Sequence, residues 1–388
     1  MTDAKNMFFV ILLGIIPVLG AQVLLPELTG PHSIGLRNLE LVDYDRVDPF
    51  SPSDSPRDLM VTLYYPTSTA SSLHRPLAPQ FSPATASYVD SLLTLPPGTA
   101  SSLTTRAHLD APLGNEGSQA PVLLFSHGFG FTRGLYTSLL QDLASWGWIA
   151  VAVDHPYDAA VVEYPDGRTV HARNWSWPLD APVRELVLNT RVADLLFVLE
   201  QLGGTDKLKG GLHMQQLTDR TIENDTLAPI FNVSRVVALG HSFGGATAVE
   251  ALLNSSAVIA AADLDGFLYG PVVRLGTEKP VLVLGFPEHF ATDDPTAAPG
   301  WPALHGWKKD FTVAGTVHES YTDYPVFADI WGDEGPEAGN VAGKRMVEIQ
   351  RTYIDAFFRK FLLNVEDDGF LSSNSSQFSE VVLRRSGS

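Results

Sequence analysis

Residues 236–252 read Val-Val-Ala-Leu-Gly-His-Ser-Phe-Gly-Gly-Ala-Thr-Ala-Val-Glu-Ala-Leu, and this stretch decides the fold. Its apolar start predicts a short buried strand, and its alanine-rich end predicts a helix. The Gly-x-Ser-x-Gly pattern between them predicts a nucleophile elbow, the sharp turn that exposes a reactive serine between a strand and a helix. The pattern alone is weak evidence, but here it lies in the strand-turn-helix context that the elbow requires.

Ser242 is the residue at the tip of this turn. The turn forces a serine into a strained backbone conformation, and the glycines two residues before and two residues after it leave room where a Cβ would collide. A glycine-rich turn that only opens a helix is the alternative interpretation. We predict that Ser242 is a nucleophile.

From Pro121 onward, short apolar runs alternate with longer amphipathic segments. This alternation indicates βαβ units around a buried parallel sheet. The predicted strands are Val122 to Phe125, Ile149 to Val153, Val236 to Leu239, Val258 to Leu264, Val281 to Leu284 and Phe311 to Val317, with an early strand at Arg57 to Tyr65. The predicted helices are Leu135 to Trp146, a segment that starts at Val192, Phe243 to Leu253 and Met346 to Leu363.

The chain is predicted to form one α/β domain, residues 22–388, with a mostly parallel central sheet flanked by helices. Its core is expected at about residues 55–362. Two segments, 155–232 and 285–308, lie between core strands, and their stretches rich in Gly, Pro, Asp and Trp predict inserted, lid-like excursions from the sheet. These elements together predict the α/β-hydrolase fold.

The composition excludes several classes of protein. The chain has 388 residues with 44 Asp plus Glu against 26 Lys plus Arg, a formal net charge of -18, which argues against a nucleic-acid partner. With 45% hydrophobic and 18% charged residues the chain buries a large core. It has no cysteine and no metal-protease, P-loop or dinucleotide-binding motif, so we expect no metal and no cofactor.

The first 21 residues have the pattern of a secretory signal peptide. An apolar run at residues 8–19 follows Lys5 and precedes the small residues Gly20 and Ala21. The run is too short to span a bilayer and Pro17 would break its helix, which makes a membrane anchor the less favoured interpretation. Five Asn-x-Ser/Thr sequons also favour a secreted, glycosylated, extracellular protein: Asn174, Asn224, Asn232, Asn254 and Asn374.

The base that activates the serine is expected to be a histidine that follows it in the chain. Only His289, His305 and His318 follow Ser242 by enough chain. His318 comes just after the last predicted strand, where a loop histidine can reach back over the sheet, and we predict it as the base. His289 and His305 fall in the predicted insertion and are interpreted as surface or lid residues.

The carboxylate that orients the base is not settled by the pattern alone. Asp263 and Asp265 end the strand that follows the elbow helix, whereas Glu288, Asp293 and Asp294 follow the next strand, the more usual position in this fold. Alternation along the strand places Asp263 and Asp265 on the same side, so spacing does not separate them.

Attack on an ester needs two preorganised backbone donors for the oxyanion. Phe243, directly after the nucleophile, is predicted to supply one N–H, and Phe129, after the strand that ends in Ser126-His127-Gly128, is predicted to supply the other. The side chain of His127 is interpreted as a buried group bonded to backbone, and His241 as a supporting neighbour. The segment Asp154-His155-Pro156-Tyr157-Asp158 is interpreted as loop-shaping rather than as a metal site.

Four motifs resemble, in the same order and at similar spacing, the platelet-activating-factor acetylhydrolases of plasma and their fungal relatives. They are Phe125-Ser126-His127-Gly128-Phe129-Gly130, Gly240-His241-Ser242-Phe243-Gly244-Gly245-Ala246-Thr247, Asp263-Leu264-Asp265-Gly266-Phe267 and Gly315-Thr316-Val317-His318-Glu319. The resemblance covers roughly residues 55–362. It implies an α/β-hydrolase in which the acid is Asp265 and in which Phe129 and Phe243 form the oxyanion hole. It also implies a calcium-independent enzyme that removes short or oxidised sn-2 acyl groups from phospholipids.

The sequence therefore predicts a secreted serine ester hydrolase with Ser242, His318 and Asp265 as its triad. A broader carboxylesterase or polyester hydrolase is the alternative within enzymes, and a catalytically silent binding module is the alternative outside them. The expected partner is a small ester or phospholipid substrate, with transient contact to a lipid surface, and no obligate protein partner is evident. The acidic surface offers no basic patch for anionic lipid.

Overall fold

A computed structural model describes residues 22–114, 120–176, 178–203, 231–288, 300–332, 337–372 and 375–387. The predicted signal peptide lies outside these residues, as do the sequons at Asn224 and Asn374. The other three sequon asparagines, Asn174, Asn232 and Asn254, are exposed at the surface. Within the described part of the chain, no helix is long and apolar enough to cross a membrane.

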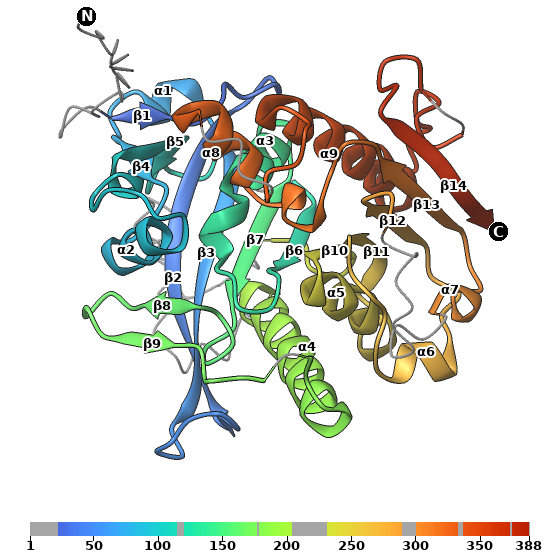
Figure 1. Ribbon diagram of the computed structural model, residues 1–388, viewed down its shortest axis with the longest axis horizontal. Coiled ribbons are helices and arrows are strands. Elements are labelled where there is room, and N and C mark those ends of the chain that lie inside the picture. The colour runs from blue at the N-terminus through green and yellow to red at the C-terminus, as the bar shows by residue number, and fades with distance from the viewer. Residues whose placement is uncertain are drawn as a thin grey trace, which may run out of the picture.

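One large mixed sheet organises the molecule (Figure 1). Its strand order is β1-β5-β2-β3-β7-β6-β10-β11-β12-β13-β14, with β4 paired to β5, and a separate hairpin pairs β8 with β9. The six strands from β7 to β13 in this order run parallel. The strands are β1 Val23–Leu24, β2 Ser33–Val47, β3 Pro56–Thr67, β4 Leu77–Pro79, β5 Leu103–Leu109, β6 Val122–Ser126, β7 Ile149–Asp154, β8 Val161–Glu163, β9 Thr169–His171, β10 Val236–His241, β11 Val258–Leu264, β12 Val281–Gly285, β13 Lys308–Val313 and β14 Val381–Gly387.

Helices cover both faces of the parallel strands (Figure 1). Helices α3, α8 and α9 pack on one face, and α4 and α5 pack on the other. The helices are α1 Thr69–Ser72, α2 Pro83–Leu92, α3 Thr137–Ser145, α4 Ala181–Gly203, α5 Phe243–Asn254, α6 Pro271–Leu275, α7 Gly300–Ala303, α8 Tyr324–Trp331 and α9 Gly343–Phe358, with a π turn at Arg359–Leu363 and 3-10 turns at Ala100–Ser102, Arg133–Tyr136 and His318–Tyr321.

Strand β6 shows why the sequence carries a continuous apolar run here. Leu123 and Phe125 belong to the core under α3 and α9, whereas Val122 and Leu124 belong to the core under α4 and α5. All four side chains are fully buried. Because both faces of a parallel sheet are covered, successive residues alternate between two cores and all of them must be apolar.

The predicted central strands agree with the structure except the last one. The strand predicted at Phe311 to Val317 begins at Lys308 and ends at Val313 instead. Gly315 takes a positive φ of 82° and the hydroxyl of Thr316 donates to the carbonyl oxygen of Val313, so the chain turns before Val317. This turn brings His318 onto the edge of the sheet.

Helix α4 begins eleven residues before the predicted start at Val192. The carboxylate of Asp180 accepts the backbone N–H of Val183, which caps the first turn, and Pro182 stands within that turn. Both signals were present in the sequence. Several elements were not predicted at all, the longest being β2, whose 15 residues pair antiparallel with β3.

A buried network of charges joins α4 to the sheet. The guanidinium of Arg57 binds Asp194 of α4 at 2.7 Å and Asp48 at 2.8 Å, with side chains exposed by 2% or less. Asp194 also accepts from Arg46 at 2.7 Å and from Nδ1 of His155 at 2.9 Å. Burial alone would raise the pKa of Asp194, but the charge of Arg57 and the hydrogen bonds from Arg57 and His155 hold it below its ordinary value.

We expect Asp194→Asn to lower the free energy of unfolding by about 3–5 kcal/mol at pH 7, because it leaves buried Arg57 without its main counter-charge. A depressed folded-state pKa stabilises the protein above the unfolded-state pKa of about 4, and this stabilisation disappears as the pH falls below it. The wild type should therefore lose more stability between pH 6 and pH 3 than the variant does. Urea unfolding measures both effects.

The matched control is Asp166→Asn. Asp166 also pairs with an arginine, Arg168, but its side chain is 62% exposed, so the loss should be about 0.5 kcal/mol or less. A loss for Asp194→Asn no larger than for this control would show that the network does not stabilise the fold.

Candidate active site

The turn between β10 and α5 has the strand-turn-helix geometry that the sequence predicts. β10 lies in the middle of the sheet between β6 and β11. Ser242 follows it with φ 57° and ψ −123°, a left-handed conformation that costs a non-glycine residue about 1–3 kcal/mol. Helix α5 begins at the next residue, so the serine hydroxyl stands at the carboxyl edge of the sheet.

Three glycines allow this turn, because the chain approaches itself too closely for a side chain. A Cβ on Gly240 would lie 2.1 Å from the carbonyl oxygen of Gly244, and a Cβ on Gly244 would lie 2.0 Å from that of Ser126. A Cβ on Gly245 would lie 1.8 Å from Oδ1 of Asp263. The first turn of α5 is therefore pressed against both neighbouring strands.

Ser242, His318 and Asp265 lie together, as the sequence predicts. Nε2 of His318 is 2.9 Å from Oγ of Ser242, and Nδ1 of His318 is 2.5 Å from Oδ2 of Asp265. Since a carboxylate only accepts, Nδ1 carries the proton and Nε2 accepts from the serine hydroxyl. The other oxygen of Asp265 accepts the backbone N–H of Phe286 at 2.9 Å, which fixes the carboxylate.

The structure separates the acidic residues that the pattern left open. β11 ends at Leu264, and Asp265 has a positive φ of 58°, so the two aspartates do not share a side as strand alternation predicted. Asp263 turns back and accepts the N–H of Gly266 at 2.8 Å. Glu288 is exposed, and Asp293 and Asp294 lie outside the described residues.

Of the other two histidines considered as bases, His305 does not join this group. His305 stands 3.6 Å from Glu278. Glu278 precedes β12, and His305 precedes β13, so both lie at the amino edge of the sheet, opposite to Ser242. His289 lies outside the described residues.

A second Ser-His-Asp arrangement occurs behind the first. Oγ of Ser126 is 2.9 Å from Nε2 of His155, whose Nδ1 is 2.9 Å from Oδ2 of Asp194. All three residues are fully buried, whereas the side chain of His318 is 35% exposed. Burial and the nearby charge of Arg191 lower the pKa of His155 to about 4. The imidazole of His155 is therefore neutral beside the ionised carboxylate of Asp194, and full burial closes the inner group to substrate. This agrees with the loop-shaping role expected for the segment of His155.

The backbone of the loop after β6 is fixed by hydrogen bonds from buried side chains. The carbonyl oxygen of Gly128 accepts from Nδ1 of His127 at 2.6 Å, from the N–H of Phe131 at 3.2 Å and from Arg191 at 3.4 Å. A trans peptide points its C=O and the following N–H in opposite directions. The N–H of Phe129 therefore points away from these donors, and the ring of Phe129 lies 5.9 Å from that of Phe243.

Two buried histidines, His127 and His241, form hydrogen bonds through both ring nitrogens, and their partners define the tautomers. Burial and the charge of Arg191 lower the pKa of His127, which donates from Nδ1 to Gly128 and accepts the N–H of His155 at Nε2. This bears out its interpretation as a buried histidine bonded to backbone. His241 lies 3.0 Å from the carbonyl oxygen of His318 through Nε2 and 2.9 Å from the hydroxyl of Tyr136 through Nδ1.

Sequence reasoning missed Arg191 and Tyr136. Arg191 forms a double hydrogen bond with Asp158 at 2.6 and 2.7 Å and donates to the carbonyl oxygen of His127 at 2.5 Å. A charged residue one turn from Leu188 and Leu195, on the buried face of α4, was the available signal. Tyr136, which accepts the N–H of Gly128 at 2.9 Å, gave no such signal.

The segment that carries His318 is tied down by a buried carboxyl. Asp323 accepts from Nε2 of Gln80 at 2.7 Å and from the N–H of Ser138 at 3.1 Å, while its own N–H donates to Leu135. Burial raises the pKa of Asp323 to about 7, and the hydrogen bonds offset only part of that rise. In the described residues, no group of three or more His, Asp or Glu side chains could hold a metal ion.

The mostly parallel sheet, its two helical layers and the elbow define an α/β-hydrolase. Residues 18–369 match the family described as platelet-activating factor acetylhydrolase, isoform II. The chain belongs to this family, and it is an ester hydrolase. The family, fold class and enzyme class predicted from the sequence are thus confirmed.

Three similar proteins match most of the chain. A protein of Arthroderma benhamiae, named probable 1-alkyl-2-acetylglycerophosphocholine esterase, is 29% identical over 395 residues, which cover 94% of each chain. The platelet-activating factor acetylhydrolase of Cavia porcellus is 26% identical and covers 87% of this chain and 78% of its own. The solved structure of a ferulic acid esterase from Streptomyces cinnamoneus is 30% identical, with a TM-score of 0.77 over 94% of this chain and 100% of that chain.

The raised pKa of Asp323 predicts a component of stability that falls with rising pH. Between the unfolded-state pKa of about 4 and the folded-state pKa of about 7, the folded state binds a proton that the unfolded state releases, so folding weakens across this window. We expect the stability of the wild type, relative to Asp323→Asn, to decrease from pH 5 to pH 7 and then to level off.

Urea unfolding of both proteins at pH 5, 6, 7 and 8 measures this difference. Asp329, an exposed carboxylate on helix α8, which begins directly after Asp323, provides the matched control, and Asp329→Asn should show a constant difference. A constant difference for Asp323→Asn as well would contradict the prediction.

Proposed function

We propose that Ser242, His318 and Asp265 hydrolyse carboxylic esters through an acyl-enzyme. Oγ of Ser242 attacks the ester carbonyl while Nε2 of His318 takes its proton, and that proton then passes to the departing alkoxide. Water attacks the acyl-enzyme in the second half, with the same histidine first as base and then as acid. Asp265 keeps the proton on Nδ1 and stabilises the imidazolium. The unbroken hydrogen-bonded series Ser242–His318–Asp265 is the observation that carries this proposal.

The backbone N–H groups of Phe243 and Phe129 are proposed to bind the oxyanion. The N–H of Phe243 is the first in α5 and has no acceptor within the helix, and the helix dipole favours negative charge there. The N–H of Phe129 belongs to the Gly128–Phe129 peptide. The carbonyl oxygen of this peptide accepts hydrogen bonds from His127 and Arg191. Donors fixed in this way stabilise the transition state without reorganising.

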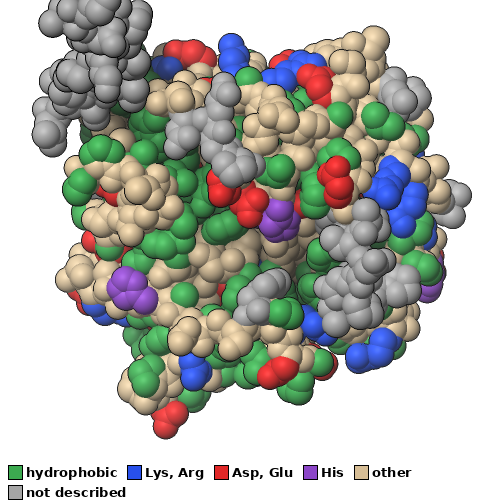
Figure 2. Space-filling model, in the orientation of Figure 1, with side chains coloured by type: hydrophobic (Ala, Val, Ile, Leu, Met, Phe, Trp, Pro, Cys, Tyr) green, Lys and Arg blue, Asp and Glu red, His purple; other side chains and the backbone are tan. Residues whose placement is uncertain are grey.

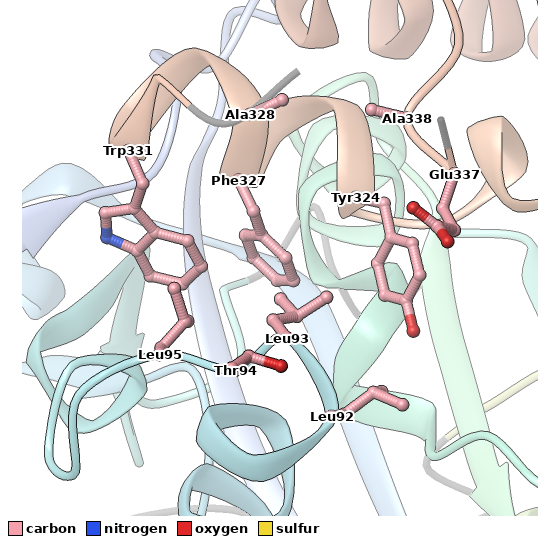
Figure 3. A pocket seen from close by; sticks show the side chains of 10 residues that line it. All are labelled: Leu92, Leu93, Thr94, Leu95, Tyr324, Phe327, Ala328, Trp331, Glu337 and Ala338. Atoms are coloured by element: carbon pink, nitrogen blue, oxygen red, sulfur yellow. The ribbon is translucent and has the colours of Figure 1, made fainter. Parts of the chain in front are cut away.

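The proposed substrate is a phospholipid with a short or oxidised sn-2 acyl chain. The names of the relatives from Arthroderma benhamiae and Cavia porcellus support this choice. The structure supports it through a cavity of about 300 Å³ between the end of α2 with the loop that follows it (Leu92–Leu95) and helix α8 (Figure 3). The aromatic rings of Tyr324, Phe327 and Trp331 point into this cavity, and Thr94 and Glu337 add polar groups to its lining. A long alkyl chain of a lipid would fit among these side chains.

A series of aromatic rings connects this cavity to the residue before the proposed nucleophile. The ring of Tyr324 is 6.2 Å from that of Phe131, and Phe131 stacks 6.0 Å from the ring of His241, the neighbour of Ser242. Hydrophobic side chains gather on the surface around α2 and α8, beside a histidine near the middle of this face (Figure 2). An alkyl chain of the lipid could therefore bind in this cavity while the ester group lies at Ser242.

We further propose that the protein is secreted and glycosylated. The leader pattern of residues 1–21 and the exposed positions of Asn174, Asn232 and Asn254 support this. The second candidate function is hydrolysis of aromatic acyl esters, which the similarity to the ferulic acid esterase favours. The aromatic rings of Phe129, Trp175 and Phe243, next to the proposed oxyanion hole, would suit such an acyl group.

Initial rates on phosphatidylcholines with sn-2 chains from acetyl to long, beside methyl ferulate and p-nitrophenyl acetate, distinguish the two candidates. We expect cleavage of short sn-2 chains, little cleavage of long ones and no activity in Ser242→Ala. Turnover of methyl ferulate without any phospholipid turnover would favour the aromatic esterase. Retained activity in Ser242→Ala would refute the triad.

Arg191 gives a second test, because it holds the peptide that carries the Phe129 N–H. Arg191→Lys keeps the charge but loses the double hydrogen bond to Asp158 and the contacts to the two carbonyls. We expect kcat to fall about 10-fold to 100-fold on every ester with little change in KM, since a misplaced oxyanion donor acts only in the transition state.

The control for this variant is Arg235→Lys. Arg235 lies before β10 at the opposite edge of the sheet, and among the described residues it donates to the carbonyl oxygen of Phe361. The kcat of Arg235→Lys should therefore equal that of the wild type. Circular dichroism and the urea midpoint check that Arg191→Lys folds. A folded Arg191→Lys with wild-type kcat would show that the loop does not depend on Arg191.

A further inference from the structure

Four aromatic rings form a wall beside the proposed oxyanion hole. The rings of Phe129 and Phe243 lie 5.9 Å apart and form its centre. Trp175 extends the wall from Phe129, with 6.1 Å between ring centroids, and Tyr269 extends it from Phe243 at 5.9 Å. The wall thus continues from the two residues that flank the nucleophile to Trp175 on one side and Tyr269 on the other.

An arginine covers each outer ring of this wall. The guanidinium carbon of Arg173 lies 5.5 Å from the ring centre of Trp175, and that of Arg184 lies 4.7 Å from the ring centre of Tyr269. The side chain of Arg173 is exposed and that of Arg184 is half-buried. Both guanidinium groups can therefore be reached by a ligand lying against the wall.

These arginines have no carboxylate partner among the residues that the structure describes. Arg57, Arg133, Arg168 and Arg191 each form an ion pair with Asp or Glu, as expected in a chain with 44 acidic residues and 26 basic ones. In a protein with a net charge of -18, two arginines that pair with no described carboxylate, both against the same aromatic wall, give this wall a local positive charge.

The guanidinium groups on the aromatic wall indicate which kind of ligand it would bind. A guanidinium binds phosphate and carboxylate through paired hydrogen bonds. A quaternary ammonium would need an open aromatic face, but the guanidinium groups already occupy faces of Trp175 and Tyr269. The wall therefore suits an anionic group better than a choline cation.

We propose that Arg173 and Arg184 form a subsite for an anionic group of the ester substrate, either a phosphodiester or a carboxylate. The subsite rests on the proposed function, because the wall reaches the ester only if Ser242 is the nucleophile. It determines specificity and takes no part in bond breaking. Its expected effect is on KM for charged esters, while kcat and the hydrolysis of neutral esters are left unchanged.

The test compares Arg173→Gln, Arg184→Gln and the double variant with Arg235→Gln, which removes the same charge at the opposite edge of the sheet. Two pairs of substrates compare an ester with and without an anionic group. 1-Alkyl-2-acetylglycerol lacks the whole phosphocholine of 1-alkyl-2-acetylglycerophosphocholine, and p-nitrophenyl butyrate lacks only the carboxylate of p-nitrophenyl hemiglutarate. We expect the double variant to raise KM for a charged member about 10-fold, or about 1.4 kcal/mol, and to leave its neutral counterpart unchanged.

The two pairs identify the source of the negative charge. A selective rise for the glycerophosphocholine substrate assigns the subsite to the phosphodiester of the headgroup, and a selective rise for hemiglutarate assigns it to the carboxylate of an oxidised acyl chain. Glutarate and glycerophosphocholine as competitive inhibitors give a readout without turnover of the charged group. The weaker binding in the double variant should appear in the inhibition constant of the matching inhibitor.

Equal KM values for the double variant and the wild type on both charged substrates would overturn the subsite. So would an equal rise on charged and neutral substrates. Either result, with Ser242→Ala inactive and short-chain phospholipids cleaved, leaves the proposed function intact. Selectivity for hemiglutarate without any phospholipid turnover would keep the subsite and refute the phospholipid substrate.

Discussion

The close contact between helix α5 and the sheet is the constraint on which the site depends. A Cβ at Gly240, Gly244 or Gly245 would lie 1.8–2.1 Å from its nearest neighbour, so only glycine lets the helix begin this close to β6 and β11. That position forces Ser242 into a left-handed conformation with φ 57°. The same contact fixes the start of the helix, so the N–H of Phe243, the first of the helix, directly follows Ser242. The strain at one residue is balanced by the packing of a whole helix, which is why it persists.

Access, rather than hydrogen-bond geometry, separates the two Ser-His-Asp arrangements of this protein. The inner group, Ser126–His155–Asp194, has serine–histidine and histidine–aspartate distances of 2.9 Å but is fully buried. Its polar atoms are satisfied by the ion pairs of Arg57 and by the contact with Arg191, so it forms a rigid polar layer behind the loop that carries Phe129. Removing one member would leave a buried charge or donor without a partner, which is costly. The inner group thus supports the shape of the outer one.

The sequence predicted the parts of the fold that local pattern determines. The six central strands and the elbow follow from apolar runs buried on both faces and from glycines around Ser242. The sequence pattern did not identify which aspartate is the proposed acid. Alternation of side chains holds only inside a strand, and Asp265 lies one residue beyond the end of β11. The family resemblance supplied that choice. The position of Arg191 on the buried face of α4 was a signal, but its partners Asp158 and His127 lie 33 and 64 residues away, so the pattern did not identify them. Tyr136 was missed because its side-chain partner, His241, lies 105 residues away.

Charge explains how an acidic protein could accept an anionic ester. At physiological ionic strength the Debye length is about 8 Å, so exposed carboxylates farther from the site are largely screened. The electrostatic potential at a bound substrate is therefore set by the charged groups nearest to it. There, Arg191 is neutralised by Asp158, whereas Arg173 and Arg184 lie against aromatic rings and pair with no carboxylate in the part of the chain that the structure describes. Aromatic faces fix the position of a guanidinium without cancelling its charge. The aromatic wall therefore holds two positive charges in place and leaves them available to a ligand.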